Sequence, residues 1–334
     1  MGGEDPLDPA SPEGRRALAR LLARAGRGGA VEAVEALSGG AASATWRLTL
    51  AGGARLVFQR TASPAEGTLP RVVQGRLMAR AGALGVPVAP VLAIAEPGDR
   101  LGDALLLGWV EGESLAPRWL KDPGFAAARA VLTRQCAQAL AHLHAPPPAH
   151  WADLPLSGGS GAALLDGLFA LYRRLGVDVP AFDLAFAALR GRMPEEPPTC
   201  LVHGDFRSGN ILVAEGGLAA VLDWELAHLS VPGEDLGWLC VHAWRFGHWR
   251  LPVGGFGTRE ALLSAYAEAG GTPPDREALR LWELFGTLRW GLSCLQLAED
   301  HLSGRVPSVE RAAIGRRATE VAADILHLLI RGDI

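Results

Sequence analysis

The chain has 334 residues, of which 49% are hydrophobic, and it carries a formal net charge of −4. This length is ample for a buried core, and the hydrophobic content lies above that of disordered chains. The charge balance excludes the strongly basic face of nucleic-acid binders, so no nucleic-acid partner is expected. Apolar runs are too short for a membrane span and the N-terminus does not have the pattern of a signal peptide, so we expect a cytoplasmic protein without a membrane partner.

The first hundred residues have the pattern of a small β-rich region. Residues 1–12 are expected to form a flexible tail, and residues 13–26 have the apolar spacing of a helix. Residues 45–50 and 55–60 alternate polar and apolar side chains around a Gly-Gly pair, which predicts a hairpin. The other elements predicted in this region are a strand at 31–37, a helix at 77–84, and strands at 90–95 and 104–110.

The remainder of the chain is dominated by helical patterns. These patterns predict an α+β fold with two lobes: a β-rich N-terminal lobe of residues 13–108 and a larger, mostly helical C-terminal lobe of residues 109–334. Two short β-runs interrupt the helices and are joined by Glu215-Gly216-Gly217. The predicted elements are helices at 125–144, 162–175 and 182–190, strands at 211–213 and 218–222, and mostly helix after residue 236.

The cysteines and the single lysine limit the available chemistry. Cys136, Cys200, Cys240 and Cys294 have no C-x-x-C spacing, so we expect four reduced core residues rather than a zinc or redox site. Lys121 is the only lysine in the chain. Any function that normally requires a lysine elsewhere must therefore use a different side chain.

Residues 201–213 and 221–225 contain the pattern with the clearest chemistry. Asp205 and Asn210 stand five residues apart, and Asp223 follows the second of the two short β-runs. A phosphoryl-transfer site must orient an attacking hydroxyl and hold metal ions against the phosphate charge. Carboxylate and amide oxygens are the ligands that Mg²⁺ uses together with substrate phosphates. Spacing of this kind is typical of the catalytic loop and metal ligands of kinase folds.

On these residues the chain resembles the aminoglycoside phosphotransferase and choline kinase superfamily. The motifs are His203-Gly204-Asp205 with Asn210 and Leu222-Asp223-Trp224-Glu225, and the likeness extends through residues 234–238. It is similar to bacterial proteins related to the kinase-like domain fused to some acyl-CoA dehydrogenases. The resemblance implies a protein-kinase-like fold, ATP or GTP with Mg²⁺ as cofactors, and phosphate transfer to the hydroxyl of a small molecule.

The resemblance also implies roles for individual residues. Asp205 matches the catalytic base, and Asn210 and Asp223 match the metal ligands. His203 matches a histidine that braces the loop, and Asp235 matches an acidic residue that steadies the loop from the start of a helix.

The N-terminal lobe matches the kinase pattern less closely. Gly39, Gly40 and Ser43 lie where the loop that covers the phosphates is expected, ahead of the predicted hairpin. Trp109 and Val110 resemble the hinge that offers backbone hydrogen bonds to adenine. A buried strand is an equally valid interpretation of the hinge segment.

The lysine that pairs with a helix glutamate in kinases has no counterpart in this sequence. Gln59 stands at the lysine position and Gln74 at the glutamate position, so an ion pair becomes a pair of amides that could still hydrogen-bond. A shift of one residue would place Arg60 there, but this reverses the face of the strand. We hypothesise that the phosphate charge is met by Arg60 or by Arg207, which lies two residues after the predicted base.

The acceptor and one alternative function remain open at this stage. A cationic acceptor would need acidic contacts, whereas an anionic acceptor would need arginines. The loss of the charged pair at Gln59 and Gln74 motivates the alternative of a pseudokinase-like module that binds nucleotide without transfer. The oligomeric state is left open. Candidate acidic contacts are Glu225, Glu283 and Glu299, and candidate basic contacts are Arg245, Arg250, Arg289 and Arg305.

Overall fold

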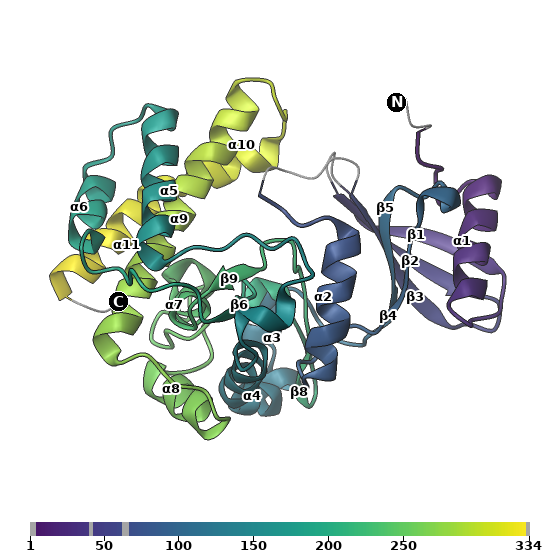
Figure 1. The fold of residues 1–334 in the computed structure, drawn as a ribbon, viewed down its shortest axis with the longest axis horizontal. Coiled ribbons are helices and arrows are strands. Elements are labelled where there is room, and N and C mark those ends of the chain that lie inside the picture. Colours follow the sequence, from purple (N-terminus) through teal and green to yellow (C-terminus); the bar gives the residue numbers. More distant parts are fainter. Residues whose placement is uncertain (1–4, 40–42, 62–66, 332–334) are drawn as a thin grey trace. The chain divides into compact units, whose positions relative to one another are not determined.

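A computed structural model of the protein describes residues 5–39, 43–61 and 67–331. The chain divides into two compact units: unit 1 comprises Met1–Glu111 and Ala219–Leu226, and unit 2 comprises Gly112–Leu218 and Ala227–Ile334. Unit 1 is built around a sheet and unit 2 mostly from helices, which confirms the predicted fold class (Figure 1). The lobe boundary predicted after residue 108 stays a prediction.

Unit 1 contains a five-stranded antiparallel sheet. The strand order is β1-β2-β3-β5-β4, so β5 lies between two strands that precede it in the chain. The predicted hairpin is confirmed as β2 and β3, and Gly52 and Gly53 form its turn with φ of 95° and 84°, a conformation that favours glycine. The strands are β1 (Val31–Gly39), β2 (Ser43–Leu50), β3 (Arg55–Thr61), β4 (Val91–Ile94) and β5 (Asp103–Gly108).

Helix α1 (Pro12–Arg24) covers one face of this sheet (Figure 1). Its apolar side chains join a buried cluster with strand residues such as Phe58 and Leu106. Ser11 caps the helix by accepting a hydrogen bond from the Gly14 N–H. Part of the expected tail is held in place, because the Leu7 N–H donates to the Arg100 carbonyl at 2.9 Å.

Helix α2 (Arg71–Ala83) packs on the opposite face, against β4 and β5. The helix begins at Arg71, six residues before the predicted start, so that prediction was wrong at its N-terminal end. Pro70 offers no side-chain cap, and the cap comes instead from β5, where the Asp103 carboxylate accepts from the N–H groups of Arg71 and Val72 at 2.8 and 3.2 Å. A cap that is distant in sequence gives no local signal for the start of a helix.

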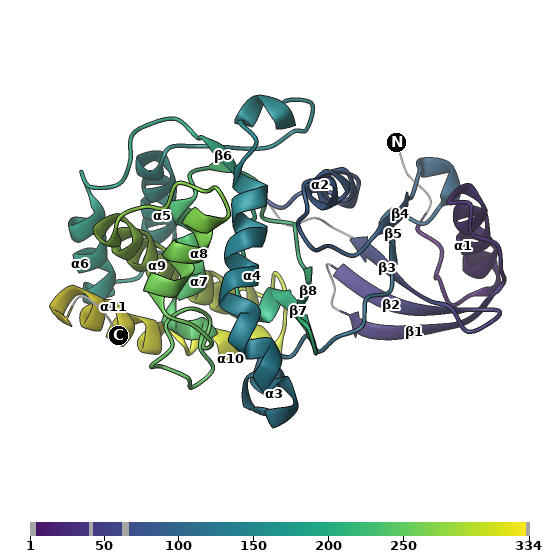
Figure 2. The same ribbon diagram turned by 90° about the horizontal axis from the view of Figure 1, so that it is seen from below.

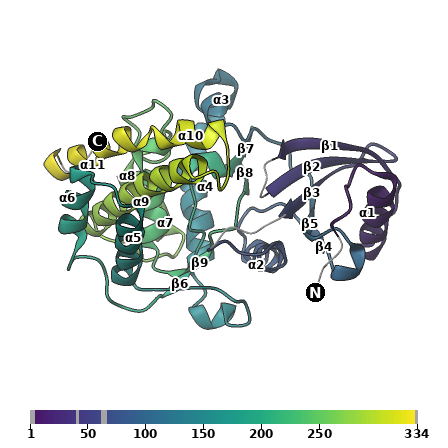
Figure 3. The ribbon, with the colours of Figure 1, turned by 90° about the horizontal axis from the view of Figure 1, so that it is seen from above.

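Unit 2 is organised around its longest helix, α9. Helices α5, α6, α7, α10 and α11 all pack against α9, while α4 packs against α8 and β6 (Figures 2 and 3). The predicted helices at 125–144, 162–175 and 182–190 are confirmed as α4, α5 and α6. The helices are α3 (Ala116–Lys121), α4 (Ala126–His144), α5 (Gly161–Leu175), α6 (Pro180–Leu189), α7 (Gly233–Cys240), α8 (Arg259–Glu268), α9 (Arg276–Leu302), α10 (Val309–Gly315) and α11 (Ala318–Arg331).

Two further sheets each consist of a pair of short strands. The predicted β-runs are confirmed as β7 (Ile211–Ala214) and β8 (Gly217–Val221), which form one two-stranded sheet. A second pair, β6 (Cys200–Val202) and β9 (His228–Ser230), was not predicted, because a three-residue strand is too short to show alternation.

The four cysteines are all buried and unpaired, as predicted. Burial raises the pKa of the Cys136 thiol to about 12, which keeps this thiol protonated and unreactive. Within residues 5–39, 43–61 and 67–331, no helix is both long enough and apolar enough to cross a membrane.

Candidate active site

The candidate site is the loop that leaves β6 in unit 2. Strand β6 ends at Val202, and His203, Gly204 and Asp205 follow immediately. Gly204 has a φ of 76°, so a glycine is required at this bend. The chain then turns through Ser208–Asn210, a short 3₁₀ segment, before it enters β7.

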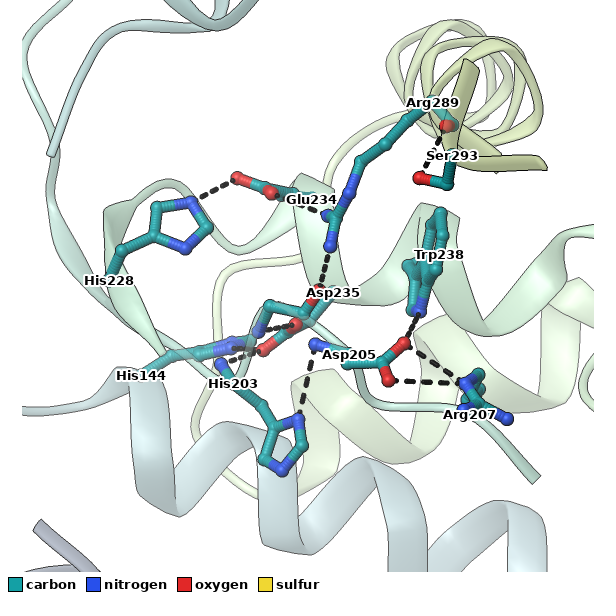
Figure 4. A network of polar contacts seen from close by, with 11 residues as sticks. His144, His203, Asp205, Arg207, His228, Glu234, Asp235, Trp238, Arg289 and Ser293 are labelled. Atoms are coloured by element: carbon teal, nitrogen blue, oxygen red, sulfur yellow. Dashed lines mark hydrogen bonds and ion pairs between the residues drawn. The ribbon is translucent and has the colours of Figure 1, made fainter. Parts of the chain in front are cut away.

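Asp235 holds this loop from the first turn of α7. Its side chain is fully buried, and its carboxylate accepts hydrogen bonds from the backbone N–H groups of His203 and Gly204 at 2.7 and 2.9 Å (Figure 4). The loop-steadying role predicted for Asp235 is therefore confirmed. His203 is buried as well, and its Nδ1 accepts from the Asp205 N–H at 3.2 Å, as the predicted bracing role requires.

A second histidine, His144 of α4, completes the support of Asp235. His144 Nε2 lies 3.1 Å from the Asp235 carboxylate, and His144 Nδ1 lies 2.9 Å from the Tyr266 hydroxyl. Burial alone would raise the pKa of Asp235, but the hydrogen bond and charge of His144 hold that pKa below its ordinary value. The loop is thus anchored on an ionised carboxylate in the interior.

The Asp205 carboxylate accepts hydrogen bonds from three side chains, and those from Trp238 and Arg207 are drawn in Figure 4. Trp238 Nε1 donates to Oδ1 at 2.8 Å, Asn210 Nδ2 donates to Oδ2 at 2.5 Å, and Arg207 Nε lies 3.0 and 3.2 Å from the two oxygens. The Asp205 side chain keeps 12% of its surface exposed. The carboxylate is therefore fixed in orientation while part of it stays accessible.

Trp238 is itself held by Arg289, which the sequence suggested only as a candidate contact to an anionic acceptor. Arg289 of α9 lies over the Trp238 ring, with Cζ 4.3 Å from the centroid, and donates to the Gly204 carbonyl at 2.5 Å and to Glu234 at 3.2 Å. Glu234 also contacts His228 at 3.1 Å. Burial would raise the pKa of Glu234, but the nearby His228 and Arg289 charges hold it below its ordinary value.

A sequence signal for Trp238 was available. Trp238 stands three residues after Asp235, so both side chains lie on the same face of α7. A predicted loop-bracing aspartate therefore indicates its neighbour on that face as a second contact to the loop. For Arg289 no comparable local signal exists, because α9 is distant in sequence and reaches the loop only through the fold.

Arg207 lies beside the candidate base. Its Nε forms an ion pair with Asp205, and its Cζ lies 4.8 Å from the centroid of the Trp244 ring. The side chain is 26% exposed, so its outer nitrogens can reach solvent or a ligand. Ser208 fixes the loop next to it by donating to the Trp244 carbonyl.

Asn210 is oriented so that its oxygen can serve as a metal ligand. Its Nδ2 donates to both the side chain and the backbone carbonyl of Asp205, at 2.5 and 3.1 Å. These bonds leave Oδ1 as the atom to face a cation, and a hard amide oxygen fits Mg²⁺. In the described part of the chain no three His, Cys, Asp or Glu side chains form a metal cluster. A kinase-type site does not need such a cluster, because phosphate oxygens and water supply most of its ligands.

The second predicted metal ligand, Asp223, is grouped with unit 1. It follows β8, its side chain is exposed, and its φ of 62° lies in the left-handed region. Such a backbone conformation in a non-glycine residue is uncommon and is frequent at functional sites.

In unit 1, β3 places Gln59 and Arg60 on opposite faces of the sheet. Gln59 lies opposite Leu105 in the register, and Leu105 faces α2, because a Cβ on Gly75 of that helix would lie 2.6 Å from its Cδ2. Arg60 points the other way: it donates to the Leu7 carbonyl at 2.7 Å, and its guanidinium lies over Trp46. Gln59 therefore occupies the α2 face.

Among the described residues, Gln59 and Gln74 do not form the hydrogen bond that the two amides could have made. Gln74 is buried on α2, and its Nε2 donates to the Leu69 carbonyl at 2.6 Å. Its Oε1 accepts from Arg71 Nη1 at 2.8 Å. The helix is thus held by an arginine that no sequence pattern identified.

The structure describes all but one of the other residues predicted to bind nucleotide. Gly39 ends β1 and Ser43 begins β2, while Gly40 lies outside the described residues. Trp109 and Val110 follow β5 directly, as a hinge segment would.

Two of the acceptor-contact candidates are accounted for by the core of unit 2. Glu283 is 1% exposed and accepts from Arg245 at 2.9 Å and from Arg259 at 2.7 and 2.9 Å. Arg245 has a side chain with no exposed surface. The prediction that Glu283 or Arg245 contacts an acceptor is therefore wrong, since the two are partners in a buried ion cluster.

Comparison with known proteins identifies the class to which this fold and site belong. The chain resembles, at 33% identity over 125 residues, mouse acyl-CoA dehydrogenase family member 11; the match covers 33% of this chain and 15% of the mouse protein. Macrolide 2′-phosphotransferase from Brachybacterium faecium superposes with a TM-score of 0.62 at 23% identity, covering 90% of this chain and 97% of that one. The GDP complex of aminoglycoside 2′-phosphotransferase-IIIa superposes with a TM-score of 0.63 at 16% identity, covering 93% and 99%.

These structures share the kinase-like fold of this chain. The sequence profile described as "Phosphotransferase enzyme family" matches residues 33–282, and the protein belongs to this family. The family is one of phosphotransferases, and the fold of the chain is kinase-like.

Proposed function

We propose that the chain transfers the γ-phosphoryl group of ATP or GTP to a hydroxyl group of a small molecule, with Asp205 as general base. The observation that carries this proposal is the Asp205 carboxylate itself. It is oriented by Trp238, Asn210 and Arg207, retains an exposed surface, and sits on a loop braced by a buried aspartate. Rigid placement of a base within reach of the attacking hydroxyl is the main protein contribution to phosphoryl transfer.

In this reaction Asp205 orients the acceptor hydroxyl and takes its proton as the oxygen attacks phosphorus. The indole N–H of Trp238 and the amide of Asn210 fix the carboxylate, so no side-chain reorganisation is needed. Asn210 through Oδ1 and Asp223 through its carboxylate would hold Mg²⁺. When bound, Mg²⁺ neutralises charge on the phosphate oxygens.

Arg207 is the second catalytic candidate. Its guanidinium is anchored at Nε by Asp205 and on one face by Trp244, which leaves the Nη end of the fork directed outward. We infer that this end donates to the transferring phosphate. Arginine is suited to this role, because its planar fork can bind two phosphate oxygens at once.

The nucleotide is proposed to contact unit 1. The segment from Gly39 to Ser43, which includes Gly40, would cover the phosphates with backbone N–H groups. The segment at Trp109 and Val110 would meet the base. A GDP-bound relative of the same fold supports a nucleotide ligand and leaves the choice between ATP and GTP to experiment.

The experiment is a transfer assay with MgATP and MgGTP against a panel of acceptors. The panel contains aminoglycosides, macrolides, choline-like amines and hydroxyacyl-CoA thioesters, and Asp205→Ala is the control. Turnover with one class that is abolished in Asp205→Ala establishes the kinase and identifies its acceptor class. Nucleotide binding with no transfer, and no nucleotide hydrolysis above the Asp205→Ala background, would instead support the pseudokinase-like binding module.

A further inference from the structure

The α2 face of the sheet in unit 1 lacks the strand lysine that kinases use against nucleotide phosphates. Gln59 occupies that position and carries no charge, while Arg60 next to it points to the α1 face. Since Lys121 is the only lysine in the chain, no lysine can take over the role. A positive charge on this face must come from an arginine on another element.

Arg71 of α2 brings a cation to this face. It is the first residue of the helix and only 5% exposed. Its Nε donates to Thr61 Oγ1 at 2.9 Å, and its Nη1 donates to Gln74 Oε1 at 2.8 Å. Thr61 stands two residues after Gln59 on β3, so both side chains lie on the same face of the strand. The guanidinium is therefore tied to β3 and α2 on the face where the lysine would be.

The amide of Gln74 suits this arrangement better than the usual glutamate would. Its Nε2 donates to the Leu69 carbonyl at 2.6 Å, which directs Oε1 toward Arg71. A carboxylate at position 74 would place an oxygen without a proton against the Leu69 carbonyl oxygen, a repulsive contact. Gln74 thus orients the guanidinium and adds no negative charge of its own.

We propose that Arg71 contacts the nucleotide phosphates in place of the strand lysine, with Gln74 as its positioning residue. The positive charge has moved from strand β3 to the first turn of α2, and the neutral amide replaces the helix carboxylate. A guanidinium is a planar fork of donors, a geometry that matches two phosphate oxygens at once. This inference rests on the proposed function, since it requires a nucleotide ligand.

The test compares the binding of MgATP and adenosine to the full chain by titration calorimetry. Arg71→Gln is the test variant, and Arg76→Gln, an exposed arginine on the same helix, is the matched control. We expect Arg71→Gln to weaken MgATP binding by about 10- to 100-fold, the effect of a lost charge-assisted hydrogen bond, and to leave adenosine binding within about twofold. Arg76→Gln should bind both ligands as the wild type does.

An equal loss of MgATP and adenosine affinity in Arg71→Gln would overturn the proposal, because it would show a purely structural role. Unchanged MgATP affinity would overturn it as well. If the wild type binds neither MgATP nor MgGTP, the proposed function fails together with this inference. If the wild type binds MgATP and Arg71→Gln binds it with the same affinity, only the role of Arg71 is refuted and the proposed function stands.

Arg71→Lys covers the case in which Arg71→Gln does not fold, as judged by its thermal unfolding. A lysine keeps the charge but cannot bridge Thr61 and Gln74 with the geometry of a guanidinium. We expect a weaker preference for MgATP over adenosine than in the wild type, with adenosine affinity unchanged. A preference equal to that of the wild type would contradict the proposed geometry, and so would a parallel loss for both ligands.

Discussion

The loop around Asp205 in unit 2 and the α2 face of the sheet in unit 1 differ in whether their charged side chains stand where the kinase pattern predicts them. Around Asp205, acidic and basic side chains stand at the positions that the kinase pattern predicts, and each has an oriented partner. On the α2 face, the predicted positions hold two glutamines, and the buried cation is Arg71 on a different element.

The difference follows from what each region must do. The proposed base and metal ligands would act on particular atoms of the reaction, so a shift of about 1 Å would be costly and the residue types would be constrained. A charge that stabilises phosphates needs only to reach them, and a long side chain can do so from a helix as well as from a strand. The predictions below test this contrast, beginning with the largest expected effect.

Replacing Asp235 with alanine should have the largest effect. The change leaves two buried backbone N–H groups of the loop without an acceptor and removes the Asp235 partner of His144 Nε2. Breaking a buried, charged network of this kind costs about 3–5 kcal/mol of unfolding free energy. Urea unfolding measures the loss. Asp183→Ala, an exposed residue also in the first turn of a helix, is the control and should cost less than about 1 kcal/mol. Similar losses for the two variants would mean that Asp235 does not anchor the loop.

Arg207→Ala should reduce kcat by about 100-fold, the usual effect of removing one donor to a transition-state oxyanion. The acceptor identified in the transfer assay is the substrate for this measurement. Arg192→Ala removes an exposed arginine that pairs with Glu277 elsewhere in unit 2, and it should leave kcat unchanged. An Arg207→Ala enzyme with the wild-type kcat would refute the phosphate role of Arg207.

Trp238→Phe keeps an aromatic ring for Arg289 and removes the indole N–H bonded to Asp205, together with the rest of the five-membered ring. Losing one hydrogen bond to a charged group should lower kcat by about tenfold. Trp290→Phe is a matched control, because among the described residues the Trp290 N–H is buried without a partner. Equal activities of the two variants would show that orienting Asp205 through Trp238 contributes nothing to transfer.

The acid dependence of stability should report the ionised state of Asp235 and is the smallest of these effects. Because its pKa is lowered in the folded chain, the unfolded chain binds more protons at Asp235. This contribution is therefore fully present above the ordinary value of 3.8 and is lost as the pH falls through the folded pKa. The stability gap between wild type and Asp235→Asn, measured by urea unfolding, should narrow below pH 3.8. A constant gap would argue that Asp235 is not ionised in the folded chain.

Much of the fold was predictable because its signals are local. The β2–β3 hairpin depends on alternation around Gly52-Gly53, and α4 depends on helical spacing. The candidate loop could be singled out because Asp205 and Asn210 lie on one short segment. Gln59 was correctly placed on the face opposite Arg60, since strand geometry determines that alternation.

The features that sequence patterns did not predict all depend on residues that are distant along the chain. Helix α2 begins at Arg71 because Asp103 of β5 caps it. Asp205 is held from α7 by Trp238, and Arg289 of α9 supports that ring. Such partners come together only in the folded chain.

The most direct test of the central claim measures turnover and MgATP binding for wild type and Asp205→Asn in parallel. Asparagine keeps the size of the side chain and one carbonyl oxygen but cannot act as a base. Transfer of the γ-phosphate should fall by about 1,000-fold or more, while the Kd for MgATP stays within about threefold. If both proteins bind MgATP equally and neither transfers phosphate to any acceptor tested, Asp205 is not a catalytic base and the chain binds nucleotide without chemistry.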